Sequence, residues 1–276
     1  MAVIPMSEST VNTQTNAHMS KGDVLMRVDD LQKSFGALQV TDHASFAVER
    51  GSITGLIGPN GAGKSTMFNL ISGFYEPEGG SVTVNDANVT GMQPYEVAEH
   101  GLIRTFQTPR KVEGMTVREA MLVGPQNQPG ESFFELFTAP SRVGEAERKN
   151  LDRVEQVLEE FEIDHLATQP ATDLSGGQMK LVELARAMLA EPEILLLDEP
   201  VAGVNPTLAN KLADQIRRLN EAGTTFLIIE HDMDFIMNLA DPIIVLDQGS
   251  VLTEGTPDEI RANERVIDAY LGGGGA

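Results

Sequence analysis

The sequence predicts an α/β protein that combines parallel and antiparallel strands, and three observations support this fold class. Continuously apolar segments follow amphipathic helical segments in the second half of the chain, as in a parallel sheet covered on both faces. The apolar segment 53–57 runs into a glycine-rich loop and then into a helical stretch over 64–72. Alternating apolar and polar residues at 24–28, 44–48 and 81–84 predict half-buried antiparallel strands.

Length and composition favour one globular domain with an inserted subdomain. The chain has 276 residues, of which 41% are hydrophobic, which is enough for a sizeable core. The formal net charge of −21 argues against a nucleic-acid partner, because phosphate backbones bind clustered Lys and Arg. Without cysteine the chain has no disulfide or thiolate metal site, which fits a reducing cytoplasm. No apolar run is long enough for a membrane span.

The parallel strands are expected late in the chain. The segments 194–197 and 225–229 are continuously apolar, and helical patterns at 178–189 and 208–222 precede them, so right-handed βαβ crossovers are expected. A strand, a turn and a second strand follow over 243–254.

Two regions depart from this alternation. Residues 1–20 are rich in Ser, Thr, Asn and Gln and lack the pattern of a secretion signal, so we expect a disordered tail. The region from about 108 to 172 is charged and helical in pattern, with apolar residues at helical spacing over 148–161 and a break at 124–130. This region predicts a mostly helical insertion in the α/β core.

A phosphate-binding loop lies between the strand at 53–57 and the helix that begins at Lys64. Residues 58–66 match the pattern G-x-x-x-x-G-K-[ST], in which backbone N–H groups and the start of a helix surround an anion. Lys64 would contact the β- and γ-phosphates, and the Ser65 hydroxyl suits Mg²⁺. An ordinary glycine-rich turn is the alternative, which the strand–loop–helix context disfavours. The expected nucleotide-binding residues are Gly58, Pro59, Asn60, Gly61, Ala62, Gly63, Lys64, Ser65 and Thr66.

Two carboxylates end the strand at 194–197. Asp198 would lie at the carboxyl end of a buried strand, where open α/β sheets bind ligands, and would hold Mg²⁺ directly or through water. Glu199 would then polarise the water that attacks the γ-phosphate. A strand that ends in a solvated acidic turn is the alternative, and the phosphate-binding loop disfavours it.

A second anion-binding helix start is predicted at residues 174–178. Leu-Ser-Gly-Gly-Gln stands directly before a helix, so the serine hydroxyl and glycine amides can bind an anion. A glycine-bearing helix cap is the alternative for this motif taken alone. One ATP needs only one such site, so a second suggests that each ATP is held between two protomers. The residues involved are Ser175, Gly176, Gly177 and Gln178.

The order of these motifs resembles that of ABC-transporter ATP-binding subunits across residues 23–272. The resemblance implies a P-loop ABC-type ATPase core with an antiparallel β subdomain and an inserted α-helical subdomain. It places one ATPase domain at 21–276, with the helical subdomain at about 108–185. ATP and Mg²⁺ are the implied cofactors.

The resemblance also implies roles for three further residues. Gln107 would contact Mg²⁺ and the attacking water and pass the signal to membrane subunits. His231 would contact the γ-phosphate, and Phe35 would stack on adenine. A satisfied or solvated imidazole and a core aromatic are the plainer interpretations of His231 and Phe35.

One position departs from the family pattern and points to a subgroup. Asn205 stands where an aspartate is usual, so the loop keeps a hydrogen-bonding side chain without the charge. This variant, the segment 230–233 and the ending 266–272 are similar to ATPases of branched-chain amino-acid uptake systems. Relatives in urea, amide and lipopolysaccharide systems share much of these motifs.

The resulting hypothesis is the motor of an ABC importer. Its partners would be transmembrane permease subunits, a second ATPase subunit in a homodimer or heterodimer, and indirectly a periplasmic substrate-binding protein. It would act peripherally on the cytoplasmic face of the bacterial inner membrane. Residues 133–137, rich in Phe, could dock a permease or pack in the core, with equal support.

Two other classes fit less well. A soluble ABC ATPase that acts on DNA or ribosomes usually has two cassettes or a long coiled coil, whereas this chain has one cassette, no heptad run and strong acidity. A P-loop GTPase needs an Asn-Lys-x-Asp motif, and the segment 210–213 lacks the aspartate.

Overall fold

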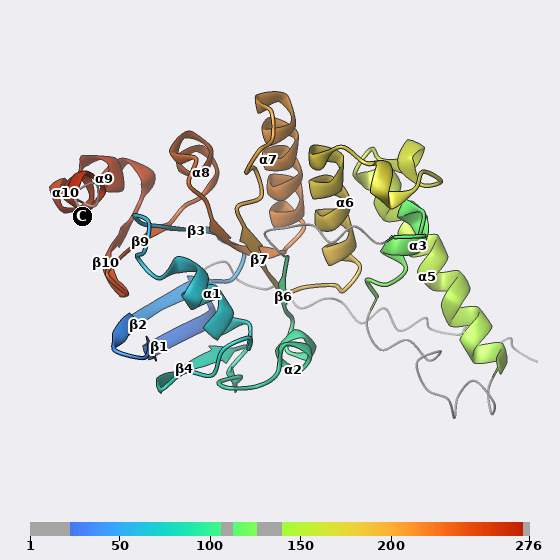
Figure 1. Ribbon diagram of the computed structural model, residues 1–276. Helices are drawn as coiled ribbons and strands as arrows, with labels where there is room; N and C mark the ends of the chain where they lie inside the picture. The colour runs from blue at the N-terminus through green and yellow to red at the C-terminus, as the bar shows by residue number, and fades with distance from the viewer. Residues whose placement is uncertain (1–22, 106–112, 126–139, 273–276) are drawn as a thin grey trace, which may run out of the picture.

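Two β-sheets form the framework of the protein (Figure 1), which the computed structural model describes over residues 23–105, 113–125 and 140–272. The larger sheet has the strand order β10-β9-β3-β8-β7-β6, and β3, β8, β7 and β6 are parallel neighbours. Every residue of β3, β7 and β8 is buried, which confirms the predicted parallel strands. The strands are β3 (Ile53–Ile57), β6 (Leu102–Arg104), β7 (Ile194–Asp198), β8 (Thr225–Ile229), β9 (Ile243–Asp247) and β10 (Ser250–Gly255).

The smaller sheet is antiparallel, with the order β2-β1-β4-β5. The expected strands at 24–28 and 44–48 are parts of two longer strands that pair as a hairpin, with register shifts along the pair. The sequence underestimated their length because polar residues that pair across the hairpin break the alternation. The strands are β1 (Val24–Phe35), β2 (Leu38–Glu49), β4 (Gly79–Val84) and β5 (Ala87–Asn88).

Helices cover the larger sheet and extend to one side of it (Figure 1). The longer predicted helices are present, and the shorter ones were not expected because so few residues carry little periodicity. No helix in the described part of the chain is both long and apolar enough to cross a membrane. The helices are α1 (Lys64–Ile71), α2 (Pro94–Glu99), α3 (Val117–Met121), α5 (Pro140–Glu160), α6 (Gly176–Met188), α7 (Pro206–Glu221), α8 (Met233–Leu239), α9 (Pro257–Ala262) and α10 (Glu264–Gly272), with 3₁₀ turns at Asp164–Leu166 and Ala171–Asp173.

The larger sheet separates two hydrophobic clusters. In β8, Phe226 and Ile228 belong to the cluster with α6, α7 and α8, whereas Leu227 and Ile229 belong to the cluster with α1 and the smaller sheet. Successive side chains of a strand point to opposite faces, so each central strand contributes to both clusters. Burial on both faces explains why these strands are continuously apolar.

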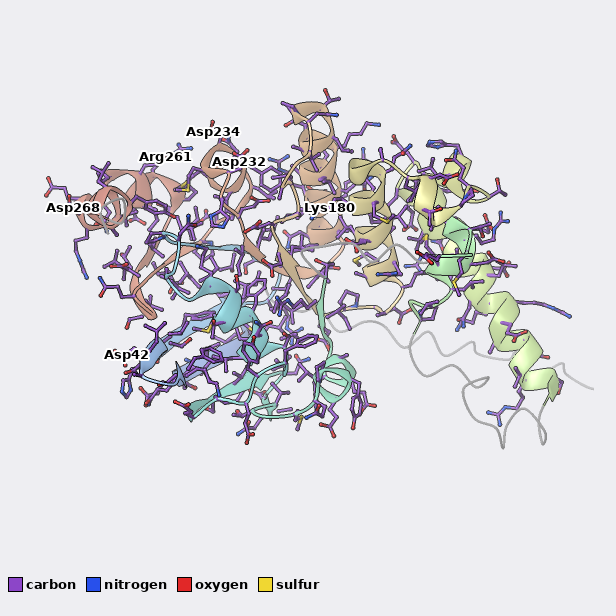
Figure 2. All side chains as sticks on the ribbon, in the orientation of Figure 1. Asp42, Lys180, Asp232, Asp234, Arg261 and Asp268 are labelled. Atoms are coloured by element: carbon purple, nitrogen blue, oxygen red, sulfur yellow. The ribbon has the colours of Figure 1, made fainter. Side chains whose placement is uncertain are left out.

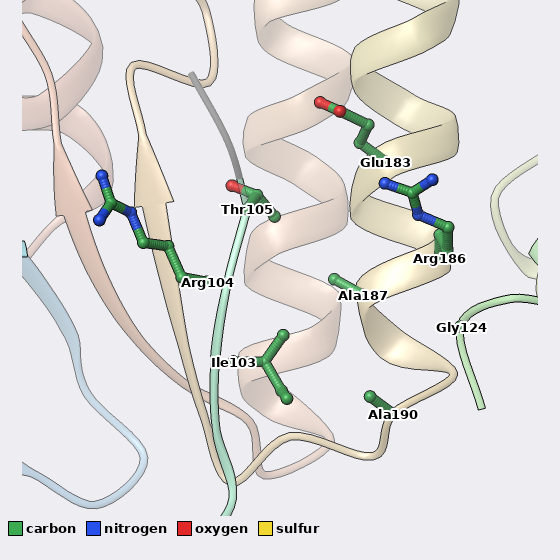
Figure 3. A pocket seen from close by; sticks show the side chains of 8 residues that line it. All are labelled: Ile103, Arg104, Thr105, Gly124, Glu183, Arg186, Ala187 and Ala190. Atoms are coloured by element: carbon green, nitrogen blue, oxygen red, sulfur yellow. The ribbon is translucent and has the colours of Figure 1, made fainter. Parts of the chain in front are cut away.

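A buried glutamate interrupts the apolar packing of α6. Glu183 is 7% exposed and lines a pocket of about 190 Å³ together with Thr105 and Arg186; Figure 3 shows its carboxylate and Thr105 on facing elements. Burial raises the pKa of Glu183 to about 7, against the opposite influence of Arg186 and Lys180. The folded protein therefore favours the protonated, neutral carboxyl.

The Glu183→Gln variant tests this burial. The Glu183 carboxyl has a pKa of about 7 in the folded chain and 4.5 in the unfolded chain. Because the unfolded chain releases the proton first, the wild type loses stability relative to the variant as the pH rises from 4.5 to 7. The loss should approach about 3 kcal/mol. Urea unfolding of both proteins across this pH range measures it, and a difference that does not change with pH would contradict the assignment.

Candidate functional site

Close backbone contacts define the phosphate-binding loop between β3 and α1. A Cβ atom on Gly58 would lie 2.2 Å from the carbonyl oxygen of Leu246, and one on Gly63 would lie 2.5 Å from that of Val40. Gly63 also has φ +98°, which L side chains rarely adopt. The loop is therefore packed between β9 and the β1–β2 hairpin, and only glycine fits at these two positions.

Lys64 begins α1 and is only 6% exposed. Its Nζ donates hydrogen bonds to the carbonyl oxygens of Gly58 at 2.7 Å and Pro59 at 3.0 Å. Burial lowers the Lys64 pKa, whereas the nearby carboxylates of Glu199 and Asp198 raise it. The Lys64 ammonium is thus bound to the backbone of the loop and lies close to the carboxylates of Asp198 and Glu199. Ser65, the next residue, is exposed.

Asp198 ends β7 in an ion pair that sequence reasoning missed. Its Oδ2 lies 2.8 Å from an Nη atom of Arg104, at the end of β6, and both side chains are largely buried. The other Nη of Arg104 donates to Asn69 of α1 at 2.7 Å and to Ser72, the C-cap of α1, at 3.2 Å. The partners of Arg104 become visible only when β6 and β7 pair.

Glu199 and His231 meet although they follow different strands. The Nε2 of His231 lies 2.8 Å from the Oε1 of Glu199. The backbone N–H of Glu199 donates to the carbonyl oxygen of Ile229 at 2.9 Å, so the turn after β7 is bound to the end of β8. The structure therefore brings the two predicted catalytic side chains into contact. Glu230, which the sequence reasoning left without a role, is buried between their loops.

Ser175 is the N-cap of α6, so the motif stands directly before a helix as predicted. Its hydroxyl accepts from the Gln178 N–H, and the Gln178 side chain accepts from the Ser175 N–H, which together form a capping box. Ser175 and Gly176 are exposed. In Figure 1 α6 is separated from α1 by β7 and α7, so the two predicted anion-binding helix starts lie apart within one chain.

Lys180 connects α6 to the turn after β7. It lies on the helix that Ser175 caps and is labelled in Figure 2. Its Nζ donates to the carbonyl oxygen of Glu199 at 3.1 Å. A change in the position of α6 relative to β7 would therefore strain this hydrogen bond to the backbone of Glu199.

Phe35 lies at the end of β1 and is 45% exposed, so it is not a core aromatic. Its ring packs edge-to-face on Tyr75 with centroids 5.4 Å apart, and the Nζ of Lys33 lies 5.7 Å from its centroid. In the next strand, Val40 contacts Gly63 of the phosphate-binding loop. The same hairpin thus carries the exposed Phe35 ring on β1 and, on β2, a residue that lies against the loop.

Asn205, the departure from the family pattern, caps α7. Its side-chain oxygen accepts from the Leu208 N–H at 3.0 Å. Asn and Asp are about equally good at this position, so the change of charge preserves the cap. Gln107 and the residues 133–137 lie outside the described residues.

The C-terminal helix also reaches the phosphate-binding loop. Burial raises the pKa of the Tyr270 hydroxyl on α10, whereas its interaction with the backbone of Gly58 lowers this pKa. The sequence marked this segment only as similar to a subgroup. The contact was not predictable because Gly58 and Tyr270 are far apart in the sequence.

Comparisons with known proteins agree with this geometry. Residues 41–202 match the family model of the ABC transporter, and residues 250–276 match that of the branched-chain amino acid ATP-binding cassette transporter. A probable branched-chain amino acid transport ATP-binding protein LivG from Archaeoglobus fulgidus is 38% identical over 90% of this chain and 95% of its own length. The high-affinity LivG protein of Escherichia coli K12 is 40% identical over 90% and 98%.

Solved structures are similar over nearly the same length. An ATP-binding cassette of an ABC transporter in its ADP conformation has a TM-score of 0.79 and 36% identity, over 90% of this chain and 99% of that one. A nucleotide-free cassette has a TM-score of 0.78 and 36% identity, over 89% and 98%. The family model spans more than half of the chain, and the relatives span almost all of it. The chain therefore belongs to the ABC transporter family, as an ATP-binding subunit whose ATP hydrolysis is coupled to transport.

Proposed function

We propose that this chain is the motor subunit of an importer for branched-chain or other amino acids, and that two protomers hold each ATP between them. The observation that carries the proposal is the separation, within one chain, of the phosphate-binding loop from the exposed helix start at Ser175. In a head-to-tail pair, the helix start of one protomer would complete the nucleotide site of the other. The matches of residues 41–202 and 250–276 to two transporter family models support the transport class.

On the nucleotide side, the backbone of the phosphate-binding loop and Lys64 would bind the phosphates. ATP would replace the two carbonyl oxygens that Lys64 now contacts with more strongly accepting phosphate oxygens. The remaining loop residues Pro59, Asn60, Gly61, Ala62 and Thr66 would contribute backbone donors or shape. Gly176, Gly177 and Gln178 of the opposite protomer would support Ser175 against the γ-phosphate.

The residues near Lys64 fit a Mg²⁺ ion. No group of three or more His, Cys, Asp or Glu gathers among the described residues, but Mg²⁺ is usually held by one or two protein oxygens together with substrate phosphates and water. Ser65, Asp198 and Gln107 would supply such oxygens. When bound, Mg²⁺ neutralises charge on the β- and γ-phosphate oxygens. Asp198 is already buried and held in place by Arg104.

Hydrolysis would depend on Glu199 and His231. Glu199 would polarise and orient the water that attacks the γ-phosphate, while His231 would contact that phosphate. The 2.8 Å contact between the two side chains holds both on the same side of the site. Because Glu199 precedes the loop that ends in the Asn205 cap, closure by a second protomer can act on the position of Glu199.

ATP-binding subunits of ABC transporters work with transmembrane permease components. For this chain we propose permease subunits that bind the helical subdomain at about 108–185, a position on the cytoplasmic face of the bacterial inner membrane, and a periplasmic substrate-binding protein as an indirect partner. A urea, amide or lipopolysaccharide system is the alternative cargo class. Copurification with the permeases, followed by uptake assays with labelled amino acids, distinguishes these systems.

The Glu199→Gln variant tests the sandwiched-ATP proposal. It should bind ATP, form a dimer that depends on ATP, and hydrolyse ATP at least about 100-fold more slowly than the wild type, because the amide cannot accept a proton from the attacking water. Light scattering with and without Mg·ATP measures the dimer, and phosphate release measures turnover. Lys64→Ala is the control, expected to bind no ATP and to stay monomeric. A Glu199→Gln protein that stays monomeric and hydrolyses ATP normally would refute the proposal.

The Phe35→Ala variant tests adenine stacking. Stacking of a base on an aromatic ring is worth about 1–3 kcal/mol, so the Kd for ATP should rise between about 5-fold and 150-fold. Titration calorimetry with ATP measures this change. Tyr95→Ala, which removes an exposed aromatic from α2, is the matched control and should leave the Kd unchanged. An unaltered Kd in Phe35→Ala would show that the ring does not contact adenine.

A further inference from the structure

We propose that Glu230 is a positioning residue for ATP hydrolysis, whose carboxylate binds together the two loops that carry Glu199 and His231. The proposal rests on the functions proposed above for these two residues. Glu230 is the first residue after β8 and is 3% exposed. Its side chain is therefore buried, unlike that of an ordinary acidic residue on the surface.

The Glu230 carboxylate accepts hydrogen bonds from both loops. One oxygen, Oε1, accepts from the backbone N–H of Val201 at 2.8 Å, in the turn after β7. The other, Oε2, accepts from the backbone N–H of His231 at 2.9 Å and of Asp232 at 3.3 Å. Each loop is therefore attached to a different oxygen of the same carboxylate.

These bonds control where Glu199 and His231 lie. Val201 is two residues after Glu199, and His231 is the direct neighbour of Glu230. The facing side chains of Glu199 and His231 are only 2.8 Å apart. Glu199 has φ +50°, an uncommon conformation for a residue other than glycine, so the surrounding contacts must maintain its backbone.

The chemistry of Glu230 favours a carboxylate at this position. Burial raises its pKa and the charge of Glu199 raises it further, whereas the three backbone N–H bonds lower it. An ionised carboxylate has two accepting oxygens, whereas the isosteric glutamine has one accepting oxygen and an amide group that only donates. Glutamine can therefore satisfy one loop but not both, and at least one buried backbone N–H loses its acceptor.

The effect should fall on hydrolysis and not on ATP binding. Lys64 and the phosphate-binding loop are held by contacts with Leu246, Val40 and their own carbonyl groups, and the bonds of Glu230 named above do not involve them. Loss of one loop contact would displace Glu199 or His231, and a displacement of about 1 Å can lower a rate about 100-fold.

The decisive experiment measures kcat and KM for ATP in purified full-length Glu230→Gln. We expect kcat to fall between about 10-fold and 100-fold, with KM and the Kd for ATP changed less than about 2-fold. Glu230→Asp keeps both oxygens on a side chain one methylene shorter, so it should reach only one loop and show the same selective fall. Glu183→Gln, which also neutralises a buried glutamate, is the matched control, expected to leave kcat unchanged.

A double-mutant cycle separates positioning from a general loss of structure. If Glu230 acts by positioning Glu199 and His231, Glu230→Gln should lower kcat less in a Glu199→Gln or a His231→Ala background than in the wild type, because one of the positioned residues is gone. Additive losses in both double variants would overturn the proposal. An unchanged kcat in Glu230→Gln, a parallel loss of ATP affinity, or the failure of both Glu230 variants to fold would also overturn it. Normal hydrolysis by Glu199→Gln would instead refute the proposed function itself.

Discussion

The site depends on one constraint: β3, β8 and β7 are neighbouring parallel strands buried on both faces. Their buried backbone groups must pair with one another, and this pairing aligns the carboxyl ends of the strands at one edge of the sheet. The phosphate-binding loop, His231 and Glu199 follow β3, β8 and β7 within two residues. Groups that are far apart in the chain therefore meet without any loop having to bend far across the surface, as open α/β sheets allow.

Charge at this edge is arranged in compensating pairs. The chain has a formal net charge of −21, yet Lys64 and Arg104 are placed beside Asp198 and Glu199. Burying a charge is costly unless it is paired or hydrogen-bonded, so each of these groups holds its neighbour in one position. Polar groups that are already in place when the triphosphate arrives need little reorganisation during the reaction.

Local sequence predicted the motifs well but not the contacts between them. The phosphate-binding loop, the carboxylates at the end of β7 and the cap of α6 each need only a few consecutive residues, so their spacing is readable. Arg104, Glu230 and Tyr270 act on residues that are close in space and distant in sequence, and no local pattern indicates such partners. Asn205 is a local feature as well, because its cap of α7 involves only the Leu208 N–H three residues later.

The sequence by itself determined the family, the order of the motifs and the central strands, because glycines that accept unusual backbone angles and apolar runs with a fixed period have local physical causes. Only the tertiary structure decided the full length of the β1–β2 hairpin, the ion pair between Arg104 and Asp198, and the attachment of two loops to one carboxylate at Glu230. Those features arise from pairing between distant strands, where burial requires each polar group to find a partner. Short stretches of sequence thus determine the chemistry of the site residues, whereas the assembly of the sheet determines their relative positions.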